Sequence, residues 1–342
     1  MRIFLKNMFG ICTSWVPVAV MARLTGQKII LPFYHAVSDE ILPHLRYSYR
    51  IRTIRQFIHD LEFFLRFYLP VNFSDLMDII NGTMQVKKPV MALSFDDGLR
   101  EVHDIIAPLL IKKGIPATIF VNPAFVDNRS IFYKYKANLI VDRLDRARHP
   151  DSIYEVINSR LGTEIKKRSR MIKMILNTGY EKKDILDSIA ELVDLDFSAF
   201  LKVRKPYMTV EQIRQLQMQG FQIGSHSIDH PMYSGLSLDE QIKQTKESLE
   251  WIRKAFNLNY SFFAFPFTDE NVRKDFFDAV FNPDKPVANL VCGTAGLKKT
   301  ASPFHIQRVP LEDSRLRARL FISGEYLYYM LKGIAGRNVR KF

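Results

Sequence analysis

The chain has 342 residues and a formal net charge of +13, from 49 Lys and Arg against 36 Asp and Glu. Hydrophobic residues make up 47% and charged residues 25%, which excludes wholesale disorder and allows one large domain or two smaller ones. The two cysteines, Cys12 and Cys292, are far apart and in no CxxC pair. This excludes a disulfide scaffold and a zinc site built from cysteines.

The N-terminal segment 1–27 contains an apolar run over residues 8–22 that ends at Arg23. This run is shorter than the about 20 residues that cross a bilayer. We expect an amphipathic helix that packs on the domain or rests on a membrane. A cleaved signal peptide, with Arg2 and Lys6 as its basic start, is the alternative. The expected location is the cytoplasm or the periphery of the inner membrane.

The elements that follow alternate between strands and helices. Such alternation predicts a parallel α/β fold, and in a barrel of this kind the chemistry lies at the carboxyl ends of the strands. We expect a first part of the fold over 28–127, a helical insertion over 128–205 and a second part over 206–311. The expected strands are 28–36, 89–95, 116–125, 221–226, 262–267 and 287–293, and the expected helices are 52–69, 99–114, 182–195, 209–220 and 236–256.

The C-terminal segment 312–342 is expected to form a basic helix. From Lys298 onward the chain carries ten Lys and Arg against three Asp and Glu, around the apolar run FISGEYLYYMLKGI. One reading is a helix docked on the core with a solvated basic rim, and the other is a membrane-surface contact. No zinc finger, RRM signature or helix-turn-helix pattern accompanies the charge, so no nucleic-acid partner is expected.

The first motif with chemical meaning is SFDDG, residues 94–98. Asp96 and Asp97 end an apolar strand, and Gly98 permits a sharp turn before the next helix. One carboxylate could bind a metal while the other acts as a base. The alternative is a helix N-cap, in which an aspartate accepts hydrogen bonds from the first backbone N–H groups.

The second motif is SHSIDHP, residues 225–231, which again follows a strand. His226 and His230 are four residues apart, a spacing that lets two imidazoles converge on one cation. With Asp97 they form a His₂Asp set that leaves room for water, as in catalytic sites of the zinc type.

These two motifs, with the intervening LREVHDIIAPLLIKKGIPATIFV and the later FAFPF, resemble the NodB-type polysaccharide deacetylases, carbohydrate esterase family 4. The resemblance covers roughly residues 29–126 and 206–311. It implies a distorted (β/α)7-type barrel with a helical insertion. It also implies metal-dependent hydrolysis of N-acetyl, less often O-acetyl, groups on sugars.

The resemblance assigns roles position by position. Asp96 is the expected general base, and Asp97, His226 and His230 are the expected ligands of a divalent cation. Zinc is the expected metal, with cobalt, nickel or another divalent ion as alternatives, because a His₂Asp set admits several. A divalent cation lowers the pKa of bound water, and an acid must protonate the departing amine.

The sequence departs from the family at the third motif and at the catalytic acid. Pro266 and Phe267 match the wall of the substrate groove, but the arginine that orients the base is missing there. Arg308 could replace that arginine, or it could be a surface residue. His305 is the positional candidate for the acid. His35 and Tyr233 could contact the sugar, with a structural hydrogen bond and a core position as their respective alternatives.

The function that these features indicate is a bacterial metal-dependent deacetylase in surface-polysaccharide metabolism. Its expected partner is an acetylated carbohydrate or glycolipid, with peripheral membrane contact. Two alternatives remain open at this stage: a non-catalytic carbohydrate-binding or assembly protein that retains the fold, and a hydrolase of a different bond at the same metal centre.

Overall fold

The structure is a computed structural model that describes residues 2–13, 15–147 and 150–340. The chain divides into two compact units. The first, here called the barrel unit, comprises Met1–Asp39, Arg50–Asp127 and Tyr207–Phe342. The second, called the insertion unit, comprises Glu40–Tyr49 and Asn128–Pro206. The two terminal segments therefore belong to the same compact unit as the barrel.

A parallel sheet with the strand order β10-β9-β8-β7-β6-β5-β2-β11 forms the centre of the barrel unit. Its first strand, β10, and its last, β11, are consecutive in the chain and are separated only by Arg308. One segment thus pairs with β9 on one side and with β2 on the other, which nearly closes the sheet. The strands are β2 (Pro32–Tyr34), β5 (Leu93–Phe95), β6 (Ala117–Val121), β7 (Gln222–Ser225), β8 (Phe262–Ala264), β9 (Leu290–Gly293), β10 (His305–Gln307) and β11 (Val309–Pro310).

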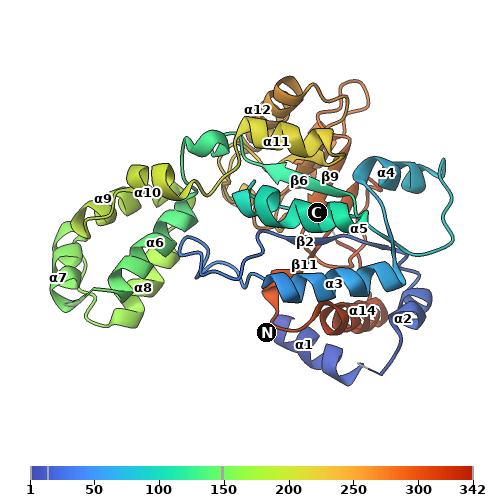
Figure 1. The fold of residues 1–342 in the computed structure, drawn as a ribbon, viewed down its shortest axis with the longest axis horizontal. Helices are drawn as coiled ribbons and strands as arrows, with labels where there is room; N and C mark the ends of the chain where they lie inside the picture. Colours follow the sequence, from blue (N-terminus) through green and yellow to red (C-terminus); the bar gives the residue numbers. More distant parts are fainter. Residues whose placement is uncertain (1, 14, 148–149, 341–342) are drawn as a thin grey trace. The chain divides into compact units, whose positions relative to one another are not determined.

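The α/β barrel-like fold expected from the sequence is confirmed. Short buried strands that alternate with helices cannot bury both faces of a parallel sheet unless the helices cover its outside. Figure 1 shows these helices around the sheet. They are α3 (Ile54–Phe67), α4 (Phe73–Asn81), the π-helix η1 (Val102–Ile106) continued by α5 (Ala107–Lys113), α11 (Val210–Met218), α12 (Leu238–Phe256) and α13 (Lys274–Val280), with the short 3-10 turns η2 (Val126–Asn128) and η4 (Tyr233–Gly235).

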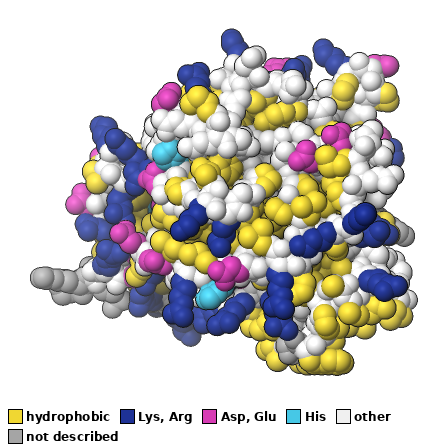
Figure 2. Space-filling model, turned by 45° about the vertical axis from the view of Figure 1, so that its right-hand side comes forward, with side chains coloured by type: hydrophobic (Ala, Val, Ile, Leu, Met, Phe, Trp, Pro, Cys, Tyr) yellow, Lys and Arg dark blue, Asp and Glu magenta, His cyan; other side chains and the backbone are white. Residues whose placement is uncertain are grey.

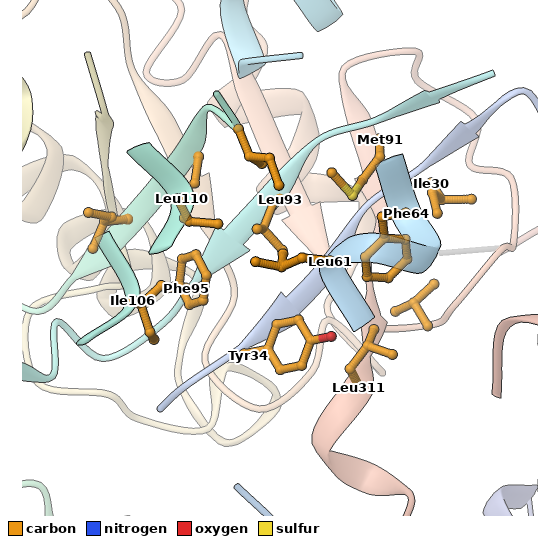
Figure 3. Close-up of a cluster of buried hydrophobic side chains, with 14 of the residues drawn as sticks. Ile30, Tyr34, Leu61, Phe64, Met91, Leu93, Phe95, Ile106, Leu110 and Leu311 are labelled. Atoms are coloured by element: carbon orange, nitrogen blue, oxygen red, sulfur yellow. The ribbon is translucent and has the colours of Figure 1, made fainter. Parts of the chain in front are cut away.

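The largest hydrophobic core fills the space between the sheet and its covering helices. In Figure 3, Leu61 and Phe64 of α3 lie against Met91, Leu93 and the neighbouring strand residues. The helix α3 starts where its sequence provides a cap. The Thr53 side chain accepts from the backbone N–H of Gln56, and the Gln56 side chain accepts from that of Thr53.

A small three-stranded sheet and three terminal helices complete the barrel unit. The sheet has the order β1-β4-β3, from Ile29–Ile30, Val90–Met91 and Leu69–Pro70. Two helices, α1 (Arg2–Cys12) and α2 (Val18–Thr25), occupy the segment 1–27 where one helix was expected. Pro17 stands in extended conformation before α2, and its ring prevents a helix from continuing through it. The 3-10 turn η5 (Leu311–Asp313) precedes the long helix α14 (Ala318–Ile334), which packs against α1 and α2.

The insertion unit is helical, and its elements are α6 (Tyr133–Asp145), α7 (Pro150–Leu161), α8 (Arg168–Leu176), η3 (Tyr180–Lys182), α9 (Ile185–Leu192) and α10 (Phe197–Arg204). It also includes Glu40–Tyr49, although the sequence predicts this segment within the first part of the barrel, 28–127. The reason is local packing. The His44 ring contacts the rings of Tyr135 and Phe200, and Asn138 donates to the His44 carbonyl.

Candidate metal centre

Three strand ends bring the candidate residues together. His35 follows β2, Asp96 follows β5 and His226 follows β7. The register pairs Tyr34 with Phe95, so His35 and Asp96 stand at the same level. Because carboxyl ends of parallel strands meet at one edge of the sheet, these side chains converge there although they are distant in sequence.

The turn after β5 explains how two adjacent aspartates serve one site. On a regular strand, neighbouring side chains point to opposite faces. Asp97 has a φ of 68° and Gly98 a φ of 65°, both left-handed, so the chain leaves the strand at Asp97. The carboxylate Oδ1 of Asp97 lies 3.3 Å from Nε2 of His230 and 3.6 Å from Nε2 of His226. All three side chains are buried.

The loop after β7 fixes the two imidazoles. Nδ1 of His226 is 2.8 Å from the Ala264 carbonyl, which can only accept, so Nδ1 carries the proton and Nε2 presents its lone pair. The backbone N–H of His230 donates to Oγ of Ser227 at 3.0 Å. The Asn122 side chain donates to the carbonyls of His226 and Ser227. These bonds hold the loop in one conformation.

The donor set fits a divalent cation. One ligand atom from each of Asp97, His226 and His230 lies within 4.8 Å of the others. Nε2 of His226 is buried without a hydrogen-bond partner among the described residues, which is costly unless an ion takes its lone pair. Burial lowers the pKa of His226 to about 4, so this ring is neutral near pH 7, as a ligand must be. A carboxylate with two imidazoles is a typical zinc-type set.

Arg308 forms an ion pair with Asp96, the aspartate that precedes Asp97. Its Nη1 and Nη2 donate to Oδ1 and Oδ2 of Asp96 at 2.6 and 2.8 Å, a bidentate pair. Burial alone would raise the pKa of the Asp96 carboxyl, but the charge and hydrogen bonds of Arg308, together with the nearby imidazoles of His226 and His35, hold that pKa below its usual range. Arg308 is fully buried, so the alternative of a surface arginine is wrong. The arginine comes from the seam between β10 and β11, not from the third motif.

His35 is held by a residue that sequence reasoning missed. Glu312 accepts from the backbone N–H groups of His35 and Ala36 at 2.9 and 3.2 Å, and its Oε2 is 2.5 Å from Nδ1 of His35. Burial opposes protonation of His35, but the charge and hydrogen bond of Glu312, together with the charges of Asp97 and Asp96, raise the pKa of His35 to about 9. No local signal marks Glu312, because the contact depends on how the last strand meets the first.

The structure does not bring His305 or Tyr233 to this edge. The Arg308 side chain points to the inside of the barrel. Because side chains alternate along a strand, the His305 side chain, three residues earlier, points to the outside. There the His305 ring stacks on Phe277 at 4.5 Å, and its Nε2 lies 3.0 Å from Asp269. Tyr233 is fully buried against Phe265, which corrects the expectation of a sugar contact.

Pro266 and Phe267 follow β8 at the carboxyl edge of the sheet. The Phe267 ring meets the His230 ring edge-on at 4.6 Å and is half-buried, whereas Pro266 is buried. Phe267 has a φ of 54°, a left-handed conformation that is unusual for a bulky residue. Of the expected groove wall, Phe267 is therefore the side chain that borders the candidate metal-binding group.

The family model for polysaccharide deacetylases matches residues 83–276, which include both motifs. The chain belongs to the polysaccharide deacetylase family. The resemblance seen in the sequence is thus confirmed. No curated protein matches the chain by sequence.

Several solved structures share the fold. The Streptococcus pyogenes deacetylase PplD, solved in complex with acetate, has 14% identity and a TM-score of 0.55, over 86% of this chain and 97% of its own. IcaB from Ammonifex degensii has 15% identity and a TM-score of 0.52, over 87% and 96%. A de-N-acetylase from Aggregatibacter actinomycetemcomitans has 13% and 0.52, over 85% and 97%. Identities this low establish a common fold alone.

Proposed function

We propose that this protein is a metal-dependent hydrolase that removes an N-acetyl group from a glycan or glycolipid of the bacterial cell surface. The observation that carries the proposal is the buried group of Asp97, His226 and His230, with Asp96 beside it. A divalent cation held there, with zinc as the first choice, would polarise the acetyl carbonyl and lower the pKa of an attacking water.

Asp96 is suited to act as the base. Its Oδ2 lies 3.8 Å from Nε2 of His226, so it stands beside the metal-binding group. Both its oxygens already accept hydrogen bonds from Arg308, which keeps the carboxylate ionised and fixes its orientation. A carboxylate that is ionised and held in place can accept the proton of the attacking water.

His35 is better placed than His305 to act as the acid. Its Nδ1 faces Glu312, and its raised pKa supports a protonated ring near neutral pH. A protonated imidazole has a second N–H, at Nε2, that it can donate. Glu312 would orient this ring in the manner of a carboxylate behind a catalytic imidazole. His305 instead points away from Asp96 and already pairs with Asp269.

Asp96 and His35 together account for the protons that move as bonds form and break. The water oxygen bonds to the acetyl carbon, and Asp96 accepts the proton that the water loses. The carbon–nitrogen bond breaks, and His35 supplies the proton that the departing amine needs. Acetate and a free amino sugar are the products. An O-acetyl substrate would follow the same path with an alcohol as the leaving group, and its weaker need for the acid would distinguish it.

The experiment that tests this proposal measures metal content and acetate release together. Purified protein stripped with a chelator and reloaded with zinc, cobalt or nickel should release acetate from N-acetylglucosamine oligomers or from a lipid-linked N-acetylated sugar. Asp97→Ala should lose both metal and activity, because it removes a ligand. Asp239→Asn, on the exposed start of α12, is the matched control and should change neither.

The outcome that would contradict the proposal is metal-loaded protein that releases no acetate from a broad panel of acetylated sugars. If such protein also binds an acetylated glycan with the same affinity in Asp96→Asn, it is a carbohydrate-binding protein with a retained fold. Release of another product would indicate a hydrolase of a different bond.

A further inference from the structure

Apolar side chains lie exposed on the two N-terminal helices and the turn between them. Their exposed fractions range from 45% to 80%. We call this set the apolar surface, and it consists of Phe4, Met8, Ile11, Trp15 and Leu24. Large hydrophobic side chains that gather on one surface, rather than standing singly, mark a site of interaction. Figure 2 shows hydrophobic side chains gathered at the lower edge of the face it draws, where α1, α2 and α14 lie in Figure 1.

The exposure of α1 follows from how this helix is fixed. Phe4, Met8 and Ile11 recur at spacings of four and three, so they share one face of the helix. The opposite face packs tightly on α14: a Cβ on Gly10 would lie 2.1 Å from the Leu320 carbonyl oxygen. Gly324 meets the Lys6 carbonyl equally closely. With glycines on both sides, α1 is held against α14 and its second apolar face points to solvent.

Charge distinguishes this surface from the rest of the molecule. Residues 1–28 contain no Asp or Glu, and residues 314–340 contain only Glu325. Glu325 is buried and forms an ion pair with Lys6, so it adds no negative charge to the exterior. Arg23 and Lys28 near α2 are exposed, as are Arg315, Arg317 and Arg319 at the start of α14. Asp313, exposed one residue before the second segment and near Lys6, is the carboxylate at its border. The apolar surface is thus bordered mostly by cations.

We propose that α1, α2 and α14 form a docking surface for an anionic lipid bilayer. Apolar side chains on a helix that lies in the interface enter the boundary between headgroups and acyl chains. Each Lys or Arg close to an anionic surface adds to the attraction. Among the described residues, none of the helices could span a bilayer. Repulsion from an anionic bilayer explains why both segments are poor in carboxylates, whereas a protein partner would not explain it.

The docking surface lies next to the segment that holds the proposed acid. Oγ of Ser314 bonds Oδ1 of Asn7 in α1, and Glu312, two residues earlier, contacts His35. Buried Arg52 donates to the carbonyls of Leu311, Ser314 and Leu316 and so fixes this segment. The segment that holds the proposed acid is therefore in direct contact with a helix of the docking surface. The docking proposal itself does not depend on the proposed catalysis.

The first experiment uses Trp15 as an intrinsic probe. The chain has two tryptophans, and Trp251 is partly buried in α12, so Trp251→Phe leaves Trp15 as the only tryptophan, to be excited at a wavelength that tyrosine does not absorb. Vesicles of phosphatidylglycerol and phosphatidylcholine should shift its emission to the blue and carry the protein upward in flotation. High salt should weaken both effects, because it screens the cations. Vesicles of phosphatidylcholine alone should bind less.

Variants make the test specific to the surface. Phe4→Glu with Ile11→Glu should abolish flotation, because it places charge on the exposed face of α1 without touching the glycine contact. Met218→Glu is the matched control: Met218 is 78% exposed on α11, and its substitution should leave flotation unchanged. Circular dichroism and metal content would verify that all variants fold.

Three outcomes would overturn the proposal. The first is wild-type protein that never floats with anionic vesicles at low salt. The second is flotation that survives Phe4→Glu with Ile11→Glu. The third is a wild-type dimer in sedimentation that these substitutions dissociate without any vesicle binding, which would make the surface a contact between copies. None of these readouts involves acetate release, so failure of docking and failure of catalysis remain distinguishable.

Discussion

The barrel unit and the insertion unit bury their polar groups in different ways. At the carboxyl edge of the barrel, buried charges face each other: Arg308 with Asp96, and His35 with Glu312. In the insertion unit, His44 is buried with neither ring nitrogen hydrogen-bonded among the described residues. There the buried Asp142 is paired with Arg46 and Arg146, which are largely exposed.

We interpret the buried charges at the barrel edge as catalytic groups and the buried polar groups of the insertion unit as structural ones. Burying several charges in one place is costly, and such clusters gather where the charges do chemistry or bind an ion, although a buried structural pair, Arg52 with Asp60, also occurs in the barrel unit. A single buried imidazole that stays neutral costs less and adds packing area. The comparison therefore predicts that similar substitutions affect activity in the barrel unit and only stability in the insertion unit.

The largest effect is expected from removal of the base. Asp96→Asn should lower the rate of acetate release by about 10²–10⁴-fold, the contribution of a positioned general base, with metal content retained. Asp142→Asn, the matched buried aspartate of the insertion unit, should leave the rate unchanged. Steady-state kinetics with elemental analysis checks both. Equal losses in the two variants would break the distinction between the units.

The next effect concerns stability. Arg308→Gln should destabilise the protein by about 3–5 kcal/mol, because it leaves the buried Asp96 charge without its partner. Arg143→Gln, which breaks a pair with Asp194 on the surface of the insertion unit, should cost only about 0–1 kcal/mol. Urea unfolding, monitored by hydrogen exchange in each unit, measures these changes in the free energy of unfolding. A barrel that keeps its stability in Arg308→Gln would contradict the argument.

A smaller effect on activity is expected at Glu312. Glu312→Gln keeps an oxygen for the backbone N–H groups of His35 and Ala36 but loses the charge that faces the ring. The rate should fall about 10–100-fold, as for other carboxylates that orient an imidazole, with KM little changed. His305→Gln should change the rate less. The reverse order would favour His305 as the acid.

The effect with the smallest slope, spread over several pH units, is a pH dependence of stability in the insertion unit. Burial, with Arg204 nearby, lowers the pKa of His44 from 6.5 to about 3. Unfolded chains bind this proton below pH 6.5 whereas the native protein does not, so stability falls as the pH drops from about 6.5 toward 3. The slope is at most about 1.4 kcal/mol per pH unit.

His44→Phe should remove that slope, because the new ring can keep the contacts with Tyr135 and Phe200 but cannot titrate. His59→Phe, at an exposed position on α3, is the control and should leave the slope as it is. Hydrogen exchange of the insertion helices at pH 5 and pH 7 makes the comparison. An unchanged slope in His44→Phe would show that another group causes the acid sensitivity.

The amino-acid sequence by itself determined the fold class and pointed to the three residues of the candidate metal site. Apolar runs of strand length, helical periodicity and the turn at Asp97–Gly98 are short-range features, and they act within a few residues of each other. The spacing of His226 and His230 is likewise local. Such features can be read in order along the chain, and the family resemblance rests on them.

The tertiary structure alone decided which residues support the aspartates and the candidate acid. Arg308 reaches Asp96 across 212 positions, and Glu312 reaches His35 across 277. Both contacts exist because the segment from His305 to Pro310 closes the barrel between β9 and β2. Strand alternation at the same seam turns His305 outward. Barrel closure joins the two ends of the chain, and no pattern within either end specifies what it will meet.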